Sequence, residues 1–303
     1  MIFSNTKKGV LFMLLATIGF SIIPVLASIG FTLDLSAAAL LFYRFLMAAL
    51  FFLAYCFVKK KSLKLESTKF YIVVILAGII YAIQCLLFFS AFRYISPSLG
   101  EILYHCYPLF ILVLAAIVLK ERITTQKIIG VILSIAGVAI TLFAPWNITE
   151  IRGIIFVVMT AFISSIYMVF TKKYTSTIDT TVLTTYLCFV CASVFLGYIL
   201  IFGEFVWINT WKEFLNAGLL AFWSTIIGLF AFMKAISYLD IGLVSILSLS
   251  EPIFTILLSY IILGTTLTML QIIGTTIILI AIYIYEIGIG KKIITETVLD
   301  TVE

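Results

Sequence analysis

Long apolar stretches alternate with short polar segments along the entire chain. Each stretch is close to the roughly 20 residues that an α-helix needs to cross the hydrocarbon core of a bilayer. The predicted spans are residues 9–30, 36–58, 70–92, 98–119, 127–144, 153–171, 180–203, 213–233, 242–263 and 268–289. They leave no room for a soluble domain, so the pattern predicts an all-α integral membrane protein with ten transmembrane helices.

The composition agrees with lipid as the solvent of this chain. Hydrophobic residues make up 64% of the sequence and charged residues 11%, with a mean hydropathy of +1.27. So few charged side chains cannot form the coat of a soluble globule. No small-residue cleavage motif follows the first span, and we therefore interpret that span as a membrane helix and not as a signal peptide.

Lysine and arginine gather in alternate connections between the spans. Because basic loops are retained in the cytoplasm, this bias predicts the orientation. The basic side carries Lys7, Lys8, Lys59, Lys60, Lys61, Lys64, Lys69, Lys120, Arg122, Lys127, Lys172, Lys173, Lys291 and Lys292, against Arg93, Arg152 and Lys212 on the other side. Both termini, including a tail at 291–303, are therefore expected on the cytoplasmic side of the cell membrane. The net charge of +5 reflects this loop bias and not a nucleic-acid surface.

The chain contains an internal repeat. Residues 91–126 and 235–270 align without a gap at an offset of 144 residues. The aligned pairs include Ala91 and Ala235, Tyr94 and Tyr238, and Pro108 and Pro252, and the same offset pairs Gly9, Phe12 and Ser21 with Gly153, Phe156 and Ser165. We therefore expect two units of five helices, 7–144 and 151–290. Since five is odd, the second unit must start from the opposite membrane face, which makes the repeats inverted.

Pro108 and Pro252 interrupt the fourth and ninth spans near the middle of the bilayer. Each lies about ten residues into its span, which is about 15 Å at the helical rise. A proline removes one amide donor and frees the carbonyl four residues earlier, here those of Tyr104 and Ser248. Freed carbonyls need partners inside a membrane, so both helices are predicted to kink and to line one polar cavity. Close packing of small residues is the alternative interpretation.

Polar residues accompany both prolines at helical spacing. They are Glu101, Tyr104, His105 and Pro108 on the fourth span, and Ser245, Ser248, Pro252, Thr255 and Ser259 on the ninth. Further cavity candidates are Ser21, Gln84 and Ser165, with Tyr107, Tyr167 and Trp223 beside them. Such a set predicts a binding site for a small amphipathic metabolite, and transporters commonly place that site between repeats.

Four ionisable residues belong to this predicted site. Arg44 and Glu251 reach midplane depth, where an unpaired charge is costly, and we expect them to form an ion pair or to share a polar network. A direct role in holding a substrate carboxylate or ammonium group is the alternative. Glu101 is expected near the solvated outer mouth. His105, the only histidine, titrates near neutral pH in water, so it is a candidate proton carrier assisted by Glu101, or else a packing residue.

The sequence offers no motif for a cofactor, a metal site or catalysis. All five cysteines lie within predicted spans, and Cys188 and Cys191 form a CxxC in an apolar helix, where we interpret them as packing residues. A GxxxxGK[ST] loop for nucleotide binding is missing from the sequence.

Several segments resemble the drug/metabolite transporter superfamily, specifically its EamA-type members with ten helices in two inverted repeats. The segments are Ala91-Phe92-Arg93-Tyr94-Ile95-Ser96-Pro97-Ser98, Leu119-Lys120-Glu121-Arg122-Ile123-Thr124, Tyr43-Arg44-Phe45, Ala235-Ile236-Ser237-Tyr238-Leu239-Asp240, Leu249-Ser250-Glu251-Pro252 and Gln271-Ile272-Ile273-Gly274. Thr265 departs from the pattern, because such proteins usually have a glutamate after the leucine and glycine that end the ninth helix.

The resemblance implies a secondary transporter that carries a small metabolite, often an amino acid or a related zwitterion, by alternating access and usually outward. An uptake carrier or exchanger of the same fold and a membrane-embedded enzyme acting on a lipid are the alternatives. The expected partners are a small-molecule substrate, protons and the lipid bilayer, and a monomer is compatible with the sequence.

Overall fold

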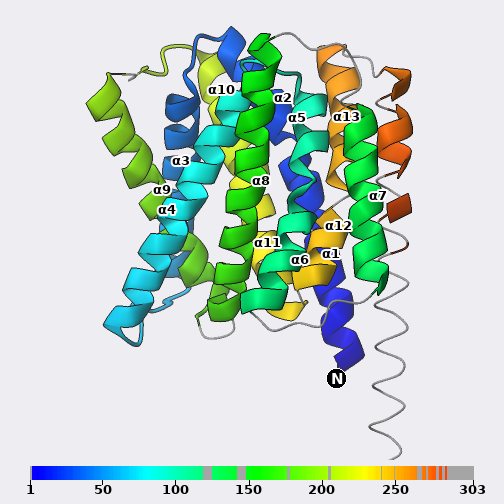
Figure 1. Ribbon diagram of the computed structural model, residues 1–303. Helices are drawn as coiled ribbons and strands as arrows, with labels where there is room; N and C mark the ends of the chain where they lie inside the picture. Colours follow the sequence, from blue (N-terminus) through cyan, green and yellow to red (C-terminus); the bar gives the residue numbers. More distant parts are fainter. Residues whose placement is uncertain are drawn as a thin grey trace, which may run out of the picture.

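The computed structural model describes residues 2–118, 125–141, 148–175, 178–203, 206–239, 241–248, 250–264, 268–270, 272–277, 280–281 and 284. Every regular element in this part of the chain is a helix, and no strand occurs there (Figure 1). The predicted all-α class is therefore confirmed. The tenth predicted span lies largely outside the described residues, so the total of ten transmembrane helices stays a prediction.

The described helices follow the predicted spans closely, with breaks in three of them, the first, fourth and ninth. The first repeat contains α1 (Ile2–Ser21), α2 (Ile23–Thr32), α3 (Ala37–Val58), α4 (Thr68–Ala91), α5 (Pro97–Tyr104), α6 (Tyr107–Val118) and α7 (Thr125–Thr141). The second contains α8 (Ile148–Thr175), α9 (Thr180–Phe202), α10 (Trp211–Leu219), the π-helix η1 (Leu220–Leu229), α11 (Phe230–Tyr238), α12 (Ile241–Ser248) and α13 (Glu251–Leu263). The eighth span is thus a continuous rod with a π-helical middle section.

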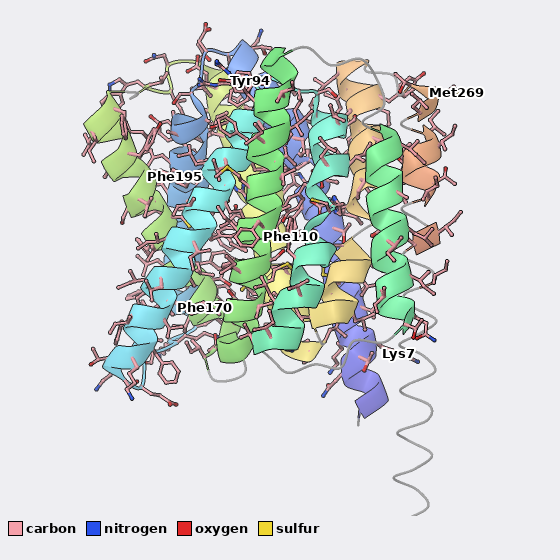
Figure 2. All side chains as sticks on the ribbon, in the orientation of Figure 1. Lys7, Tyr94, Phe110, Phe170, Phe195 and Met269 are labelled. Atoms are coloured by element: carbon pink, nitrogen blue, oxygen red, sulfur yellow. The ribbon has the colours of Figure 1, made fainter. Side chains whose placement is uncertain are left out.

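The bundle has the surface of a membrane protein. Six helical stretches in the described part of the chain are long and apolar enough to cross a bilayer, namely Asn5–Thr32, Ala37–Val58, Thr68–Ala91, Ile151–Lys172, Thr180–Phe202 and Trp211–Tyr238. Large apolar side chains cover the outside (Figure 2), and Phe57, Leu200 and Ile261 are 86%, 72% and 74% exposed. Lipid is the solvent that such a surface favours, so the chain is a multi-pass membrane protein.

Local signals explain where several helices begin and end. Ser36 and Ser96 accept hydrogen bonds from backbone amides in the first turns of α3 and α5, and Asp179 does the same for α9. Gly203 and Gly264 end α9 and α13 with φ angles of 71° and 66°, in the left-handed region that favours glycine.

The fourth and ninth spans break at equivalent positions. Helix α5 ends at Tyr104 and α6 begins at Tyr107, while α12 ends at Ser248 and α13 begins at Glu251. Both pairs are related by the repeat offset of 144 residues. The two copies therefore share the same interruption as well as the same sequence pattern.

The prolines lie just after these breaks and not at them. Pro252 is in the first turn of α13, and Pro108 is the second residue of α6. A proline is tolerated in the first turn of a helix, where its missing amide donor is not needed, so the chain bends before the proline. The predicted departure from straightness is present, but each break lies a few residues earlier than the sequence argument placed it.

The two repeats also exchange equivalent contacts. The rings of Phe12 and Tyr238 stack with centroids 6.1 Å apart, and those of Tyr94 and Phe156 lie 6.0 Å apart. The two contacts are equivalent, because the repeat offset of 144 residues relates Phe12 to Phe156 and Tyr94 to Tyr238. At the level of helices, α1 packs against α11, η1, α12 and α13, whereas α8 packs against α4, α5 and α6. The first helix of each repeat therefore packs against the later helices of the other repeat.

Candidate functional site

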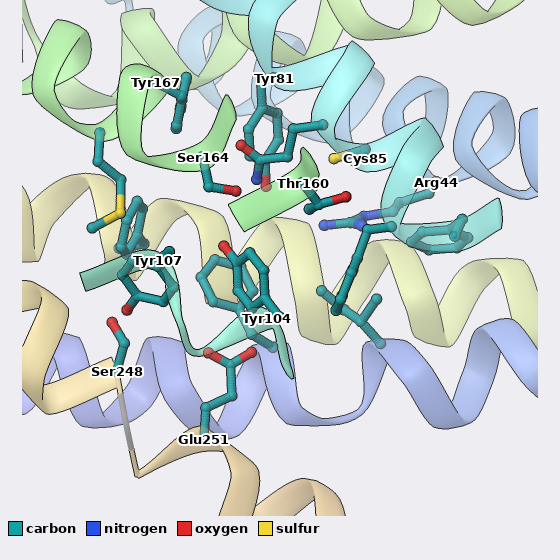
Figure 3. A pocket seen from close by; sticks show the side chains of 17 residues that line it. Arg44, Tyr81, Cys85, Tyr104, Tyr107, Thr160, Ser164, Tyr167, Ser248 and Glu251 are labelled. Carbon is teal, nitrogen blue, oxygen red and sulfur yellow. The ribbon is translucent and has the colours of Figure 1, made fainter. Parts of the chain in front are cut away.

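A cavity of about 70 Å³ lies inside the bundle between the two repeats (Figure 3). Helices α1 to α6 of the first repeat and α8, α11, α12 and α13 of the second contribute to its wall. The wall is formed by Phe20, Ile23, Arg44, Tyr81, Gln84, Cys85, Phe88, Phe89, Tyr104, Tyr107, Thr160, Ser164, Tyr167, Met168, Phe232, Ser248 and Glu251. An apolar and aromatic wall with a few polar groups is typical of sites for small molecules.

The residues that flank both helix breaks meet in this wall. Tyr104 and Tyr107 come from the first break, and Ser248 and Glu251 come from the second. Figure 3 shows the Tyr107 hydroxyl pointing toward Ser248, across the boundary between the repeats. The breaks thus direct the polar groups of both repeats into the same cavity.

Arg44 is a buried cation in the cavity wall. Its side chain is 1% exposed, and its Nε atom donates a 2.7 Å hydrogen bond to the hydroxyl of Thr225 in the π-helix η1. The guanidinium also lies over the ring of Phe45, 4.8 Å from the centroid, and 5.9 Å from that of Phe89. Its Nη2 atom meets no hydrogen-bond acceptor among the described residues. The guanidinium in the cavity wall therefore has a donor without an acceptor in the described part of the chain.

The expected ion pair between Arg44 and Glu251 is not formed. No carboxylate in the described part of the chain lies within 4.0 Å of the guanidinium, although both residues line the cavity. Figure 3 shows them reaching the cavity from different sides. Both charges line one cavity, but the position of a residue along its span does not fix the side from which its helix approaches.

Glu251 instead belongs to a cluster with Glu101 and His105. These three side chains are buried, and each offers an atom within 4.8 Å of an atom of the other two. His105 Nδ1 lies 3.4 Å from Glu101 Oε1, and His105 Nε2 lies 4.0 Å from Glu251 Oε2. The expectation of a solvated Glu101 is wrong for this conformation, because its side chain is 1% exposed beneath the neighbouring helices.

The remaining predicted residues separate into three groups. Gln84 lines the cavity, as does Tyr167. Ser21, Ser165 and Pro252 are buried but do not line it, and the serine hydroxyls donate to backbone carbonyls. The side chains of Pro108 and Ser245 lie outside the described part of the structure.

Trp223 is a weaker candidate for the cavity wall than its position in the predicted eighth span indicated. Its side chain is 37% exposed and does not line the cavity.

Sequence reasoning missed much of the wall. Tyr81, Cys85, Thr160, Ser164 and Phe232 were not singled out, although all five line the cavity. Aromatic residues make up 15% of the chain, so composition carried no signal for the particular rings that face inward. All five cysteines are buried and free, in line with a packing role.

A cavity with an apolar and aromatic wall and a few polar groups, inside a multi-pass helical bundle, is typical of a membrane transporter. The sequence matches the EamA-like transporter family over residues 7–143 and 151–286. The chain therefore belongs to that family, and both of its repeats match.

Individual relatives agree with this class. A protein of Haemophilus influenzae named as an uncharacterised transporter is 26% identical over 238 residues, which cover 75% of each chain. One of Archaeoglobus fulgidus with the same name is 33% identical over 92 residues, which are 30% of this chain and 33% of that protein. A solved crystal structure shares the fold, with a TM-score of 0.74 at 19% identity, covering 92% of this chain and 96% of the other.

Proposed function

We propose that this protein is a secondary transporter that moves a small carboxylate-bearing metabolite, an amino acid or a related zwitterion, across the cytoplasmic membrane by alternating access, in the direction of export. The residues proposed to contact the substrate are Arg44, Gln84, Tyr104, Tyr107, Ser248 and Glu251.

The observation that carries this proposal is the state of Arg44. Among the described residues, this buried guanidinium has one hydrogen bond, no carboxylate within 4.0 Å and no acceptor for Nη2, which is an expensive state in a membrane interior. A substrate carboxylate would supply the missing anion. Guanidinium and carboxylate groups match in geometry, and their charge-assisted hydrogen bonds are among the strongest in proteins.

Other polar groups in the cavity wall suit an ammonium group. Glu251 contributes a carboxylate, and Oε1 of Gln84 has no donor among the described residues. The faces of Tyr81 and Tyr167, whose centroids lie 4.7 Å apart, add aromatic surface in the same wall. A zwitterion of amino-acid type fits this distribution of charge better than a simple anion does.

Alternating access is supported by the relationship between the repeats. The breaks at Tyr104 and Ser248 are equivalent, and the reciprocal aromatic contacts relate the repeats by an approximate two-fold axis. Lys7 near the start of α1 lies at one end of the bundle, while Tyr94, which contacts the start of α8, lies at the other (Figure 2). Both features favour inverted repeats that rock around a central site.

The proposed orientation has a structural argument of its own. Lys61, between α3 and α4, and Asp179, before α9, form a 3.0 Å ion pair, so these two connections lie on the same side of the bundle. Both are assigned to the cytoplasm by the distribution of basic residues. A reporter that fluoresces only in the cytoplasm, fused to the C-terminus of the chain, tests the assignment.

Transport is tested with the purified chain in liposomes. Radiolabelled common amino acids and the matching des-amino acids are offered, and time-dependent flux of a chemically unchanged solute is the expected result. Empty liposomes are the control. Turnover of a lipid without solute flux would support the alternative, a membrane-embedded enzyme. Cells that express the chain should release the same solute faster than control cells, whereas faster accumulation would indicate an uptake carrier.

A further inference from the structure

His105 is surrounded by hydrogen-bond acceptors. Its Nδ1 atom lies 2.8 Å from the backbone carbonyl of Glu101, and its Nε2 atom lies 3.0 Å from the backbone carbonyl of Ser248. Each ring nitrogen also has a carboxylate nearby, since Nδ1 lies 3.4 Å from Glu101 Oε1 and Nε2 lies 4.0 Å from Glu251 Oε2. The imidazole is fully buried, so water does not compete for either ring nitrogen.

The number of donors decides which form of the ring fits this environment. A backbone carbonyl can only accept, and a neutral imidazole has a single N–H group. With a neutral ring, one nitrogen lone pair would face a carbonyl oxygen at 2.8 or 3.0 Å. An imidazolium has two N–H groups and satisfies both carbonyls.

The charges around the ring are compatible with the same form. Neither carboxylate oxygen of Glu101 has a hydrogen-bond donor of good geometry among the described residues, and the group is 1% exposed. Glu251 is the first residue of α13, where the helix dipole favours a negative charge. One imidazolium, one carboxylate and one carboxylic acid give the three side chains no net charge, which a membrane interior tolerates.

We propose that Glu101, His105 and Glu251 form a proton-binding site, and that the proton on His105 ties α5 of the first repeat to the end of α12 in the second. The link is the hydrogen bond from Nε2 to the carbonyl of Ser248, to which Pro252 cannot donate. When the proton leaves, one of the two carbonyl bonds of His105 is lost and the connection between the helix breaks weakens.

Glu251 gives this proton a path to the cavity. The transfer moves one proton from Nε2 of His105 to the carboxylate of Glu251, which leaves a neutral imidazole and a carboxylic acid. The acid then releases the proton to water in the cavity, which Glu251 lines and His105 does not. If the proposed transport holds, protonation of this site links two events. One is the formation of the hydrogen bond between the repeats, and the other is the binding of substrate in the cavity.

Other ionisable groups face the site. The rings of Tyr104 and Tyr107 lie 5.4 Å and 5.6 Å from the imidazole, and Arg44 and Tyr167 line the same cavity from α3 and α8. Helices α2 and α12 contribute no ionisable side chain. A divalent metal is the other occupant such a cluster suggests, but it would have to break a carbonyl contact of His105 to reach a ring nitrogen.

The single histidine allows a direct measurement. The full chain is labelled with ¹⁵N-histidine, purified with a tag that lacks histidine and placed in lipid nanodiscs without substrate. At pH 7 we expect two nitrogen signals of the protonated type, as in imidazolium. One protonated and one unprotonated nitrogen would overturn the proposal. A metal-dependent shift of a ring nitrogen on addition of Zn²⁺, reversed by a chelator, would assign the site to a metal instead.

Variants connect the signal to the cluster. Glu251→Gln and Glu101→Gln should each reduce the imidazolium population at the same pH, whereas Glu66→Gln, in the exposed connection after α3, should leave it unchanged. If neither cluster variant changes the ring, the carboxylates are not part of the site. If a variant does not fold, the wild-type pH titration of the two signals still decides the form of the ring.

Flux measurements separate this inference from the proposed function. His105→Gln should still move substrate, but an imposed pH gradient should no longer change the rate. Imidazolium signals without any flux would refute transport and leave the proton site standing. Flux that responds to the gradient equally in wild type and His105→Gln would refute the proton site and leave transport standing.

Discussion

Arg44 and Thr225 join the two repeats through a 2.7 Å hydrogen bond between the guanidinium Nε and the threonine hydroxyl. Both residues are buried, and Thr225 lies in the π-helical section of the eighth span. π-Helical turns often occur at functional sites, because the extra residue per turn redirects side chains. Here the π-helix presents an acceptor for Nε, while Nη2 has no acceptor among the described residues.

Thr225→Val should weaken both the fold and the site. The change removes the acceptor for a buried charged donor, and a hydrogen bond to a charged group contributes about 1.5–3 kcal/mol. We expect lower stability in detergent and a several-fold loss of substrate affinity, measured by thermal unfolding and by equilibrium binding. Thr225→Ser keeps the hydroxyl and is the matched control. Equal behaviour of the two variants would show that the hydrogen bond does not position Arg44.

The equivalent glycines of the repeats should respond alike to substitution. A Cβ atom added to Gly9 would lie 2.6 Å from Leu239 Cγ, and one added to Gly153 would lie 2.8 Å from Ile95 Cγ2. Overpacking of this kind costs about 1–3 kcal/mol. Gly9→Ala and Gly153→Ala should therefore both lower the unfolding midpoint. In Gly197→Ala the new atom meets nothing within 4 Å, so the midpoint should hold or rise.

A loss at only one of the two glycines would contradict the reciprocal packing of the repeats. It would mean that the contact of Gly9 with Leu239 and the contact of Gly153 with Ile95 are not equally close-packed, although the residues are equivalent.

Gln84→Met should distinguish recognition of the substrate's ammonium group from recognition of its carboxylate. Methionine has a similar volume but lacks the amide oxygen, which has no donor among the described residues. We expect weaker binding of an amino acid and unchanged binding of the des-amino acid, because only the former needs the acceptor. Competition for flux in liposomes measures both ligands. An equal loss for both would assign Gln84 to the shape of the wall.

Asp179 should contribute to the stability of the fold in a pH-dependent way. Partial burial raises the pKa of Asp179, but hydrogen bonds from Lys61 and from the amides at the start of α9 outweigh this, and the pKa is lowered. A lowered pKa stabilises the fold above the unfolded-state value of about 3.9, and the stabilisation is lost as the pH falls through the folded-state pKa.

Two variants measure the separate roles of Asp179. Asp179→Ala removes the helix cap and should cost about 0.5–2 kcal/mol, whereas Asp179→Asn keeps the cap and loses only a half-exposed ion pair of about 0–1 kcal/mol. The stability difference between wild type and Asp179→Asn should shrink on acidification below about pH 4. A difference that stays constant would show that the ion pair contributes nothing.

The sequence was sufficient for the features that depend on repetition and hydropathy. The helices in the described part of the chain, the interruption near Pro108 and Pro252, and the meeting of both broken helices at one cavity follow from helical geometry and the need to satisfy carbonyls in lipid. The carbonyl of Ser248, expected to need a partner, faces His105.

The sequence did not indicate which of these side chains contact each other or which of them line the cavity. Glu251 lies beside His105 and not beside Arg44, because rotation of a helix about its axis is set by packing and not by depth. Ser165 was favoured for its match to Ser21, yet its neighbour Ser164 lines the cavity. One residue along a helix rotates a side chain by about 100°, which a pattern of small polar residues does not resolve.

The recognition of a carboxylate by Arg44 is tested most directly with wild-type protein and a pair of competitors. The amino acid with the highest flux in liposomes is offered with its methyl ester, which keeps the ammonium group and the side chain but has no anion. We expect the ester to compete about 10- to 100-fold more weakly, since it leaves the buried guanidinium without a charged partner. We also expect loss of affinity in folded Arg44→Gln. An ester as potent as the acid, together with unchanged affinity in Arg44→Gln, would contradict the account.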